Sequence, residues 1–135
     1  MNKRIFLTAA MVAWAGGLVA CAPAEAALPS VTVDEARAAT AAGKAVLIDI
    51  REPEEHARGV AAGAKLLPMS QMGGRLSEIP SDPGTPVLLI CNTQNRSTAA
   101  LKQLRARPGY EHLRFVEGGM SEWVRRGLPV IPPSR

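Results

Sequence analysis

Residues 86–105, PVLLICNTQNRSTAALKQLR, decide the fold of this chain. The first six of these residues form an apolar run that ends at Cys91, which is typical of a strand buried on both faces of a sheet. A polar loop follows at residues 92–96. Behind it, a helical pattern at residues 97–105 places its apolar residues on one side. The stretch therefore predicts a strand, a short polar loop and a helix that packs back on the sheet.

The rest of the chain repeats this alternation of strand and helix. Further strands are expected in four apolar or β-branched runs, at residues 31–33, 45–50, 65–67 and 113–116. Helical segments are expected between them, at 34–42 with Asp34 as its cap and Gly43 as its stop, at 53–56, at 70–79 with Ser70 as its cap and a break at Gly73-Gly74, and from Gly118-Gly119 to Gly127. Strands that alternate with helices indicate an α/β fold built on a parallel sheet.

Cys91 stands where open α/β sheets usually bind their ligands, at the carboxyl end of a strand. The amides of the helix that follows point toward such a position and carry a partial positive charge. No Asp or Glu occurs from Cys91 to Arg107, so this charge is left for an anion, and Arg96 adds a full charge and several donors. These features favour a reactive thiolate at Cys91 that acts as a nucleophile.

The alternative for Cys91 is a structural role, because free Cys residues are often small buried hydrophobes. Two observations weigh against it: the residue lies at a junction of strand, loop and helix, and the chain has only one other Cys, Cys21. If Cys21 is lipid-modified or removed, Cys91 is the one thiol left in an exported protein, which needs an explanation. A thiol redox sensor is a further alternative for the same residue.

The first 20 residues predict a bacterial export signal. A positively charged start precedes an uncharged, mostly apolar run at residues 5–19, which is short for a membrane span but suits a signal peptide. Leu18-Val19-Ala20-Cys21 resembles the lipobox of bacterial lipoproteins, which implies cleavage before Cys21 and lipid modification of its thiol. Ala24-Glu25-Ala26 is an alternative site for ordinary signal peptidase, and an uncleaved anchor is the third alternative.

An Ala/Pro-rich tether is expected at residues 21–30, between the signal and the folded domain. The expected location is the periplasmic side of the bacterial cell envelope, with a lipid anchor in a membrane. Ala22 follows the modified Cys, and by resemblance to Gram-negative lipoproteins the absence of Asp at this position favours the outer membrane. A soluble periplasmic protein is the alternative.

Composition limits the classes of partner. The net charge is +4 without a basic cluster or stripe, and the chain has two Trp, two Phe and one Tyr, so nucleic-acid binding is not expected. A four-ligand zinc site would need every Cys and His in the chain, and the spacing of Cys21, His56, Cys91 and His112 matches no zinc pattern. No metal and no organic cofactor is expected.

Residues 31–131 resemble a single rhodanese domain, the domain of thiosulfate sulfurtransferases, and residues 132–135 form a tail. Five segments carry the resemblance in order: LIDIRE at 47–52, the segment from Glu55 to Pro68, CNTQNR at 91–96, FVEGG at 115–119, and Trp123 with GLPV at 127–130. The resemblance implies a five-stranded parallel sheet with helices on both faces. It also implies that Cys91 carries a persulfide and that the substrate-binding residues surround its sulfur, namely Asn92, Thr93, Gln94, Asn95 and Arg96.

Some positions depart from the family pattern. Gln94 stands where the family has Gly. A Gly at this position suggests either a positive φ, which Gln tolerates poorly, or a close approach of the backbone. His56, Val60 and Leu66 stand where the family has an aromatic residue, a His and an Asn, which bears on substrate choice and rate. Asp49 and Arg51 are expected to form a structural hydrogen-bonded pair that braces the loop.

The length of the loop separates two chemistries. Residues 91–96 form a loop of six residues, whereas related phosphatases and arsenate reductases use one residue more to fit a tetrahedral oxyanion. The loop thus resembles the sulfur-transfer type, and the resemblance to the rhodanese family implies a sulfurtransferase that moves sulfane sulfur from a small anionic donor, such as thiosulfate, to a thiol, cyanide or protein acceptor. The alternative is a low-turnover sulfur-carrier or binding module that docks on a periplasmic sulfur or redox partner.

Overall fold

The computed structural model describes residues 26–134, so the predicted signal peptide, Cys21 and the first half of the predicted tether lie outside the described residues. Strands and helices alternate along the described chain. In order they are β1 (Ser30–Val31), α1 (Val33–Ala41), β2 (Val46–Asp49), α2 (Pro53–His56), β3 (Val60–Ala61), β4 (Lys65–Leu66), two 3₁₀ helices (Met69–Gly74 and Leu76–Glu78), β5 (Val87–Ile90), α3 (Asn95–Arg105), β6 (Arg114–Val116), α4 (Gly119–Arg125) and β7 (Val130–Ile131).

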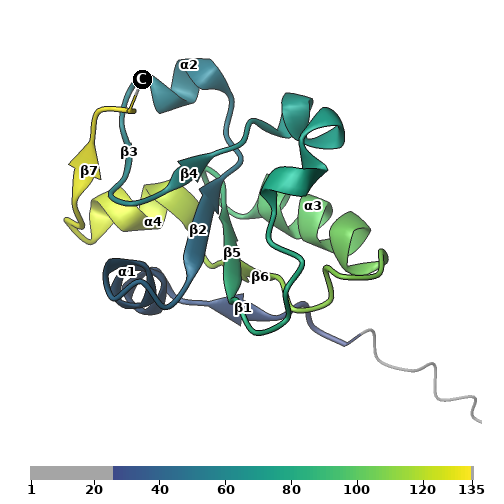
Figure 1. Ribbon diagram of the computed structural model, residues 1–135. Coiled ribbons are helices and arrows are strands. Elements are labelled where there is room, and N and C mark those ends of the chain that lie inside the picture. The colour runs from purple at the N-terminus through teal and green to yellow at the C-terminus, as the bar shows by residue number, and fades with distance from the viewer. Residues whose placement is uncertain (1–25, 135) are drawn as a thin grey trace, which may run out of the picture.

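Five of the strands form one parallel sheet in the order β1-β6-β5-β2-β4. Helices α1 and α4 cover one face of this sheet, while α3 and the two 3₁₀ helices cover the other (Figure 1). This arrangement confirms the predicted fold class, a five-stranded parallel sheet with helices on both faces.

The central strands β2 and β5 are apolar, except for Asp49 at the end of β2, because both of their faces are buried. Alternate side chains enter the two cores: Leu47, Leu88 and Ile90 pack with α1 and α4, whereas Ile48, Val87 and Leu89 pack with α3. All six are at most 3% exposed. A continuous apolar run is therefore the pattern that this position in the sheet requires.

β2 and β5 end at the same edge of the sheet. Asp49 lies opposite Ile90 in the parallel register, and the Ile50 amide donates to the Ile90 carbonyl at 2.9 Å. The segments that leave the two strands are consequently neighbours. One leads through Arg51 into α2, and the other begins with Cys91.

Two helices begin earlier than predicted. Thr32, rather than Asp34, is the N-cap of α1, because its hydroxyl accepts from the Glu35 amide while the Glu35 carboxylate accepts from the Thr32 amide. The first strand therefore ends at Val31. The helix α3 begins at Asn95 rather than at Ser97, since the Thr98 amide already donates to the Gln94 carbonyl at 2.8 Å.

Other predictions near the ends of elements were also wrong. Ser70 does not cap an α-helix but lies inside the 3₁₀ helix Met69–Gly74, where its amide and hydroxyl donate to the Glu52 carboxylate. The antiparallel pair of β3 and β7 was not predicted at all. Each of these strands has two residues, which is too short to show a strand period in the sequence.

No helix within residues 26–134 combines the length and apolarity needed to span a membrane.

Candidate functional site

Cys91 is the first residue after β5, and its thiol is almost fully buried, with 1% of the residue exposed. It is the free Cys of the described residues. The Ser97 amide, in the first turn of α3, donates to Sγ at 3.4 Å, and the Ser97 hydroxyl lies at the same distance from Sγ. That hydroxyl also donates to the Gln94 carbonyl at 3.1 Å, so its single proton is used there and the thiol proton points to Oγ.

The loop after Cys91 exposes N–H groups rather than carbonyls. Two of its carbonyl groups are taken by the first turn of α4: the Met120 amide donates to the Cys91 oxygen and the Ser121 amide to the Asn92 oxygen, both at 2.8 Å. Within residues 26–134, by contrast, no acceptor binds the backbone N–H groups of residues 92–96. This arrangement is suited to hold negative charge beside the sulfur.

The start of α4 fits the loop because of a glycine. Gly119 has a φ of +57°, and a Cβ on it would lie 2.2 Å from the Thr93 oxygen and 2.4 Å from the Cys91 oxygen. Any larger residue would push the loop away. The sequence identified Gly118-Gly119 as a turn and as part of a family signature, but its role as the support of the Cys91 loop emerges only from the structure.

Gln94 adopts no left-handed conformation. Its φ is −156°, and no residue other than Gly has a positive φ among the described residues. The Gln94 side chain instead extends toward α4, where Oε1 accepts from the Gly118 amide at 3.2 Å. Of the two alternatives for this position, a positive φ is therefore wrong. The Gln94 side chain instead connects the loop to the turn that supports it.

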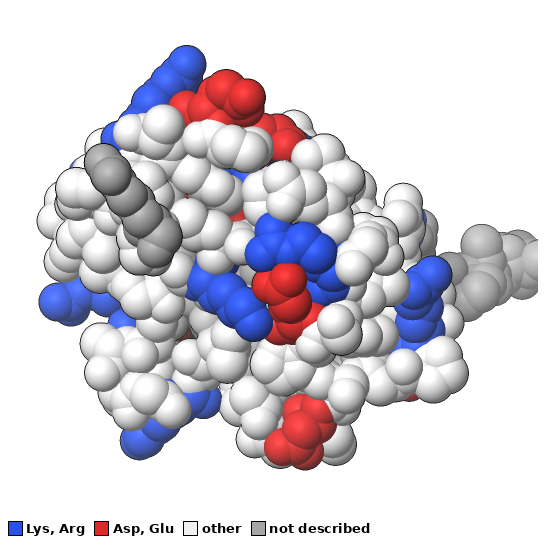
Figure 2. Space-filling view, turned by 45° about the horizontal axis from the view of Figure 1, so that its top comes forward, with Lys and Arg blue, Asp and Glu red and all other residues white. Residues whose placement is uncertain are grey.

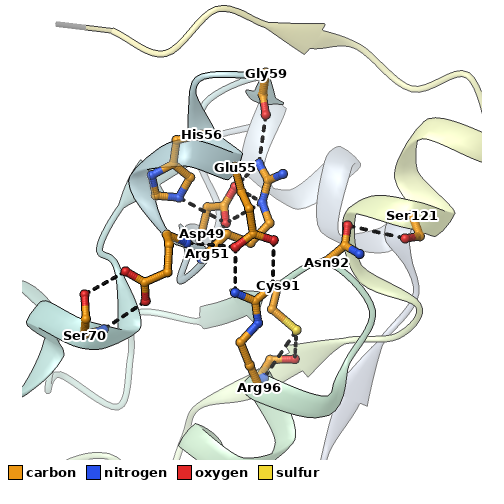
Figure 3. Close-up of polar contacts among 12 residues, drawn as sticks. Asp49, Arg51, Glu55, His56, Gly59, Ser70, Cys91, Asn92, Arg96 and Ser121 are labelled. Atoms are coloured by element: carbon orange, nitrogen blue, oxygen red, sulfur yellow. Dashed lines mark hydrogen bonds and ion pairs between the residues drawn. The ribbon is translucent and has the colours of Figure 1, made fainter.

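Arg96 does not stand free above the sulfur. Its two terminal nitrogens donate to both oxygens of Glu55 in α2, at 2.6 and 2.7 Å (Figure 3). The hydrogen bond from Arg96 lowers the pKa of Glu55 from 4.5 to about 2, against the opposing effect of burial. The pKa of Arg96 is raised, mainly by the hydrogen bond to Glu55 and further by the charge of Cys91.

Glu55 is thus a site residue that the sequence analysis missed. The stretch from Cys91 to Arg107 contains no acidic residue. The carboxylate that pairs with Arg96 belongs to Glu55, 41 positions earlier in the chain. The only signal was the place of Glu55 in the family-like segment that follows LIDIRE. Its role as the partner of Arg96 depends on the neighbouring ends of β2 and β5.

Asp49 and Arg51 form a buried pair. Arg51 Nε lies 3.0 Å from both Asp49 oxygens, Nη2 lies 2.7 Å from Oδ2, and Nη2 also donates to the Gly59 carbonyl at 2.8 Å. His56 Nε2 lies 3.3 Å from Asp49 Oδ1 in the same buried cluster. These contacts tie the end of β2 to α2 and to the residue before β3, rather than to residues 91–96 directly.

The structure brings most of the predicted site residues to one edge of the sheet, with the loop from Asn92 to Asn95 between α3 and α4. Cys21 lies outside the described residues.

Within residues 26–134, no group of three or more His, Cys, Asp or Glu side chains is placed to hold a metal ion. On the face shown in Figure 2, charged side chains occur as separate groups among uncharged surface rather than as one basic stripe.

This geometry is suited to sulfur chemistry at Cys91. A thiolate at the N-terminus of α3 is stabilised by the Ser97 amide and by the helix dipole. The loop N–H groups can hold the charge of a further sulfur atom bound to it. The site therefore combines a buried thiol with donors that are already in position.

The chain resembles known proteins over most of the described residues. The model of the rhodanese-like domain family matches residues 32–126. A protein of Allochromatium vinosum named sulfurtransferase is 39% identical over 88 residues, which make up 65% of this chain and 79% of that protein.

Solved structures show the same likeness. The rhodanese-related protein of Thermoplasma volcanium superposes with a TM-score of 0.68 at 27% identity, over 78% of this chain and 99% of that one. The polysulfide-sulfur transferase homodimer of Wolinella succinogenes gives 0.64 at 28% identity, over 80% and 81%. Since the family model covers well over half of the sequence and the fold agrees, this chain belongs to the rhodanese-like domain family.

Proposed function

We propose that this protein is a sulfurtransferase that carries sulfane sulfur as a persulfide on Cys91. One observation carries the proposal. Cys91 Sγ accepts a hydrogen bond from the Ser97 amide at 3.4 Å, and the backbone N–H groups of residues 92–96 have no acceptor within residues 26–134. Backbone N–H groups without an acceptor, in the loop that directly follows a buried sulfur, are suited to stabilise a negatively charged sulfur chain better than a neutral thiol.

The donor is proposed to be a small anion of the thiosulfate type. The Cys91 thiolate attacks the outer sulfur of thiosulfate, a bond forms between the two sulfurs, and the bond to the sulfonate breaks to release sulfite with its electron pair. The acceptor then attacks the outer sulfur of the persulfide and restores the thiolate. With cyanide as the acceptor the product is thiocyanate, and with a thiolate it is a new persulfide.

Two related proteins support this class of reaction. The relative from Allochromatium vinosum is named a sulfurtransferase, and the one from Wolinella succinogenes a polysulfide-sulfur transferase. Polysulfide, like thiosulfate, is an anion that ends in a sulfane sulfur, so both fit the same attack by Cys91. Neither donor requires a metal or an organic cofactor.

A low-turnover sulfur carrier is the second candidate. The observations that favour it are the burial of Cys91, which is 1% exposed, and the ion pair by which Glu55 neutralises Arg96. An anionic donor must compete with the Glu55 carboxylate for this guanidinium. In this second function, the persulfide on Cys91 forms once and is transferred only when a protein partner binds.

Turnover separates the two candidates. The purified protein is mixed with thiosulfate, and the persulfide on Cys91 is quantified before and after addition of cyanide. A sulfurtransferase forms many equivalents of thiocyanate per protein, whereas a carrier stops after one. If no persulfide forms from either thiosulfate or polysulfide, both candidates are wrong.

We also propose that the chain is lipidated at Cys21 and acts on the periplasmic side of the cell envelope, with the outer membrane favoured. The support is the sequence of residues 1–21. A triacylated protein should partition into detergent and stay in membrane fractions at high salt, because several acyl chains anchor stably. Cys21→Ser should block normal processing, whereas a mature amino terminus at Ala27 in the soluble periplasm would contradict lipidation and leave the role of Cys91 untouched.

A further inference from the structure

A pocket lies at the amino ends of the strands, whereas Cys91 follows the carboxyl end of β5. It has a volume of about 510 Å³, which is in the range of small-molecule sites. The pocket opens between α1 and the residues at which β2, β5 and β6 begin, and Figure 1 shows α1 at the opposite end of the molecule from α2. We call it the amino-end pocket, and its lining includes Ala39, Lys44, Pro86, Leu88 and Arg114.

Most of the lining is apolar. Leu88, which belongs to the core under α1 and α4, is 3% exposed and forms the base of the pocket. The side walls include Ala39 and Ala45 and two prolines, Pro83 and Pro86, whose backbones have no N–H to offer a ligand. A ligand that fits these walls therefore needs an apolar part.

Two cationic side chains at the pocket have no partner within residues 26–134. Arg114 lies opposite Leu88 in the parallel register of β5 and β6, so its side chain leaves the sheet on the same face as Leu88. Lys44 reaches the pocket from the segment before β2. Neither the Lys44 ammonium nor the Arg114 guanidinium forms a hydrogen bond or an ion pair in the described part of the chain. Both charges are therefore free for a ligand.

The other two titratable residues of the lining already have partners. Glu35 is the one acidic residue that lines the pocket, and its Oε2 accepts from the Thr32 amide at 2.8 Å and from the Thr32 hydroxyl at 3.0 Å. His112 Nε2 lies 3.1 Å from the Pro80 carbonyl, to which it donates because a carbonyl oxygen can only accept. Two positive charges thus face one negative charge that is engaged in the cap of α1, and this balance favours an anion.

The lining restricts the chemistry of that anion. A bare inorganic ion such as phosphate would leave the apolar walls around Leu88 in water. An uncharged apolar molecule would leave Lys44 and Arg114 without a partner. A molecule with an anionic head on a short apolar chain matches both parts of the pocket.

We propose that the amino-end pocket binds a small anionic amphiphile, with its carboxylate or sulfonate head between Lys44 and Arg114. Its alkyl chain lies against Ala39, Pro86 and Leu88. The site is separate from sulfur transfer, because Pro86 and Cys91 flank the two ends of β5. The inference therefore goes beyond the proposed function and does not depend on it.

The test uses three probes that separate the head from the chain. Isothermal titration calorimetry measures the dissociation constants of octanoate, of acetate, which has the head without the chain, and of 1-octanol, which has the chain without the charge. We expect one octanoate per protein, bound at least about ten-fold more tightly than acetate and about five-fold more tightly than octanol. Cys91→Ser should bind octanoate as wild type does, so a failure of the proposed sulfur chemistry leaves this test unaffected.

Two variants with matched controls locate the ligand. Lys44→Glu should weaken octanoate by about ten-fold and leave octanol unchanged, whereas Arg37→Glu, on the exposed surface of α1 outside the lining, should change octanoate by less than about two-fold. Ala39→Trp fills the pocket and should weaken both octanoate and octanol. Ala38→Trp, at the next position of α1 but exposed and outside the lining, should weaken neither.

Three results would overturn the proposal. Octanoate that does not bind, or that binds no better than acetate, would remove the amphiphile. Octanoate affinity that is unchanged in Lys44→Glu would remove the anionic head from this position. Octanoate affinity that is unchanged in Ala39→Trp would place the ligand outside the amino-end pocket.

Discussion

Arg96 and Glu55 form a two-point ion pair beside Cys91, with nitrogen–oxygen distances of 2.6 and 2.7 Å (Figure 3). The pair joins α3 to α2, and therefore joins the loop after β5 to the segment after β2. It holds the guanidinium in place but also cancels much of its charge. We infer that Arg96 can attract an anionic donor because Glu55 fixes where the charge of the guanidinium lies.

The first prediction concerns the loss of this pair. Arg96→Ala should lower kcat/KM with thiosulfate by about ten- to a hundred-fold, because a hydrogen bond to a charged group contributes about 1.5–3 kcal/mol. The change also leaves the Glu55 carboxylate unpaired next to an anionic donor. The double variant Arg96→Ala/Glu55→Gln should therefore recover part of the loss in steady-state assays.

The matched control is Arg125→Ala, which removes an exposed arginine paired with Glu122 on α4. It should change kcat/KM by less than about two-fold, as exposed ion pairs contribute little. A double variant no faster than Arg96→Ala would show that Glu55 does not repel the donor.

The second prediction concerns stability against pH. The pKa of Glu55 falls from 4.5 in the absence of partners to about 2 in the fold, first because of the hydrogen bond from Arg96. The stabilisation is then fully present above about pH 4.5 and is lost as the pH falls toward 2. At neutral pH, Glu55→Gln should lower the free energy of unfolding by about 1–2 kcal/mol.

Urea unfolding at neutral pH and in acid tests this directly. The difference between wild type and Glu55→Gln should shrink through the acid range. A difference that stays constant down to the lowest pH at which the protein folds would contradict the ionic origin of the stabilisation.

The third prediction compares two glycines with similar backbones. Gly119 has a φ of +57° and Gly127 one of +66°, but a Cβ meets the loop only at Gly119 and nothing within 4 Å at Gly127. Both alanine variants should lose about 1–2 kcal/mol to left-handed backbone strain. Gly119→Ala should lose a further 1–3 kcal/mol, about the cost of overpacking, and slow persulfide formation by about ten-fold or more.

Thermal unfolding and single-turnover kinetics give the two readouts. If Gly119→Ala matched Gly127→Ala in both, the close fit of α4 against the loop would have no effect on the site.

The fourth prediction concerns Gln94. Gln94→Ala should lower the free energy of unfolding by about 0.5–1.5 kcal/mol, because the Gly118 amide loses the Oε1 acceptor. Gln94→Gly should lose somewhat more, since the φ of −156° needs no Gly and the freer backbone costs entropy. A Gly variant more stable and faster than wild type would mean that Gln94 impairs the loop.

Much of the fold could be predicted because the sheet is buried on both faces. Runs such as residues 86–91 have no other simple explanation, and the five predicted strand regions all form. Errors gathered at the ends of elements, where single hydrogen bonds decide. Thr32 rather than Asp34 caps α1, because Thr32 and Glu35 form reciprocal hydrogen bonds between side chain and backbone. The spacing of the two residues in the sequence permits these hydrogen bonds but does not by itself predict them.

The site was predictable where one segment holds it and unpredictable where segments meet. Cys91 and the loop form a local pattern of strand, polar loop and helix. Glu55 and Gly119 act on that loop from α2 and from the start of α4, and their roles follow from the sheet order and from the backbone contact of Gly119.

The central claim is that Cys91 carries the transferred sulfur, and intact-mass spectrometry tests it most directly. The protein is incubated with thiosulfate without air, freed of small molecules, weighed and mapped by peptide. The account predicts one added sulfur atom on Cys91, which cyanide removes as an equal amount of thiocyanate, and no addition to Cys91→Ser. Sulfur that is absent from Cys91, or that is added equally to Cys91→Ser, would contradict the account.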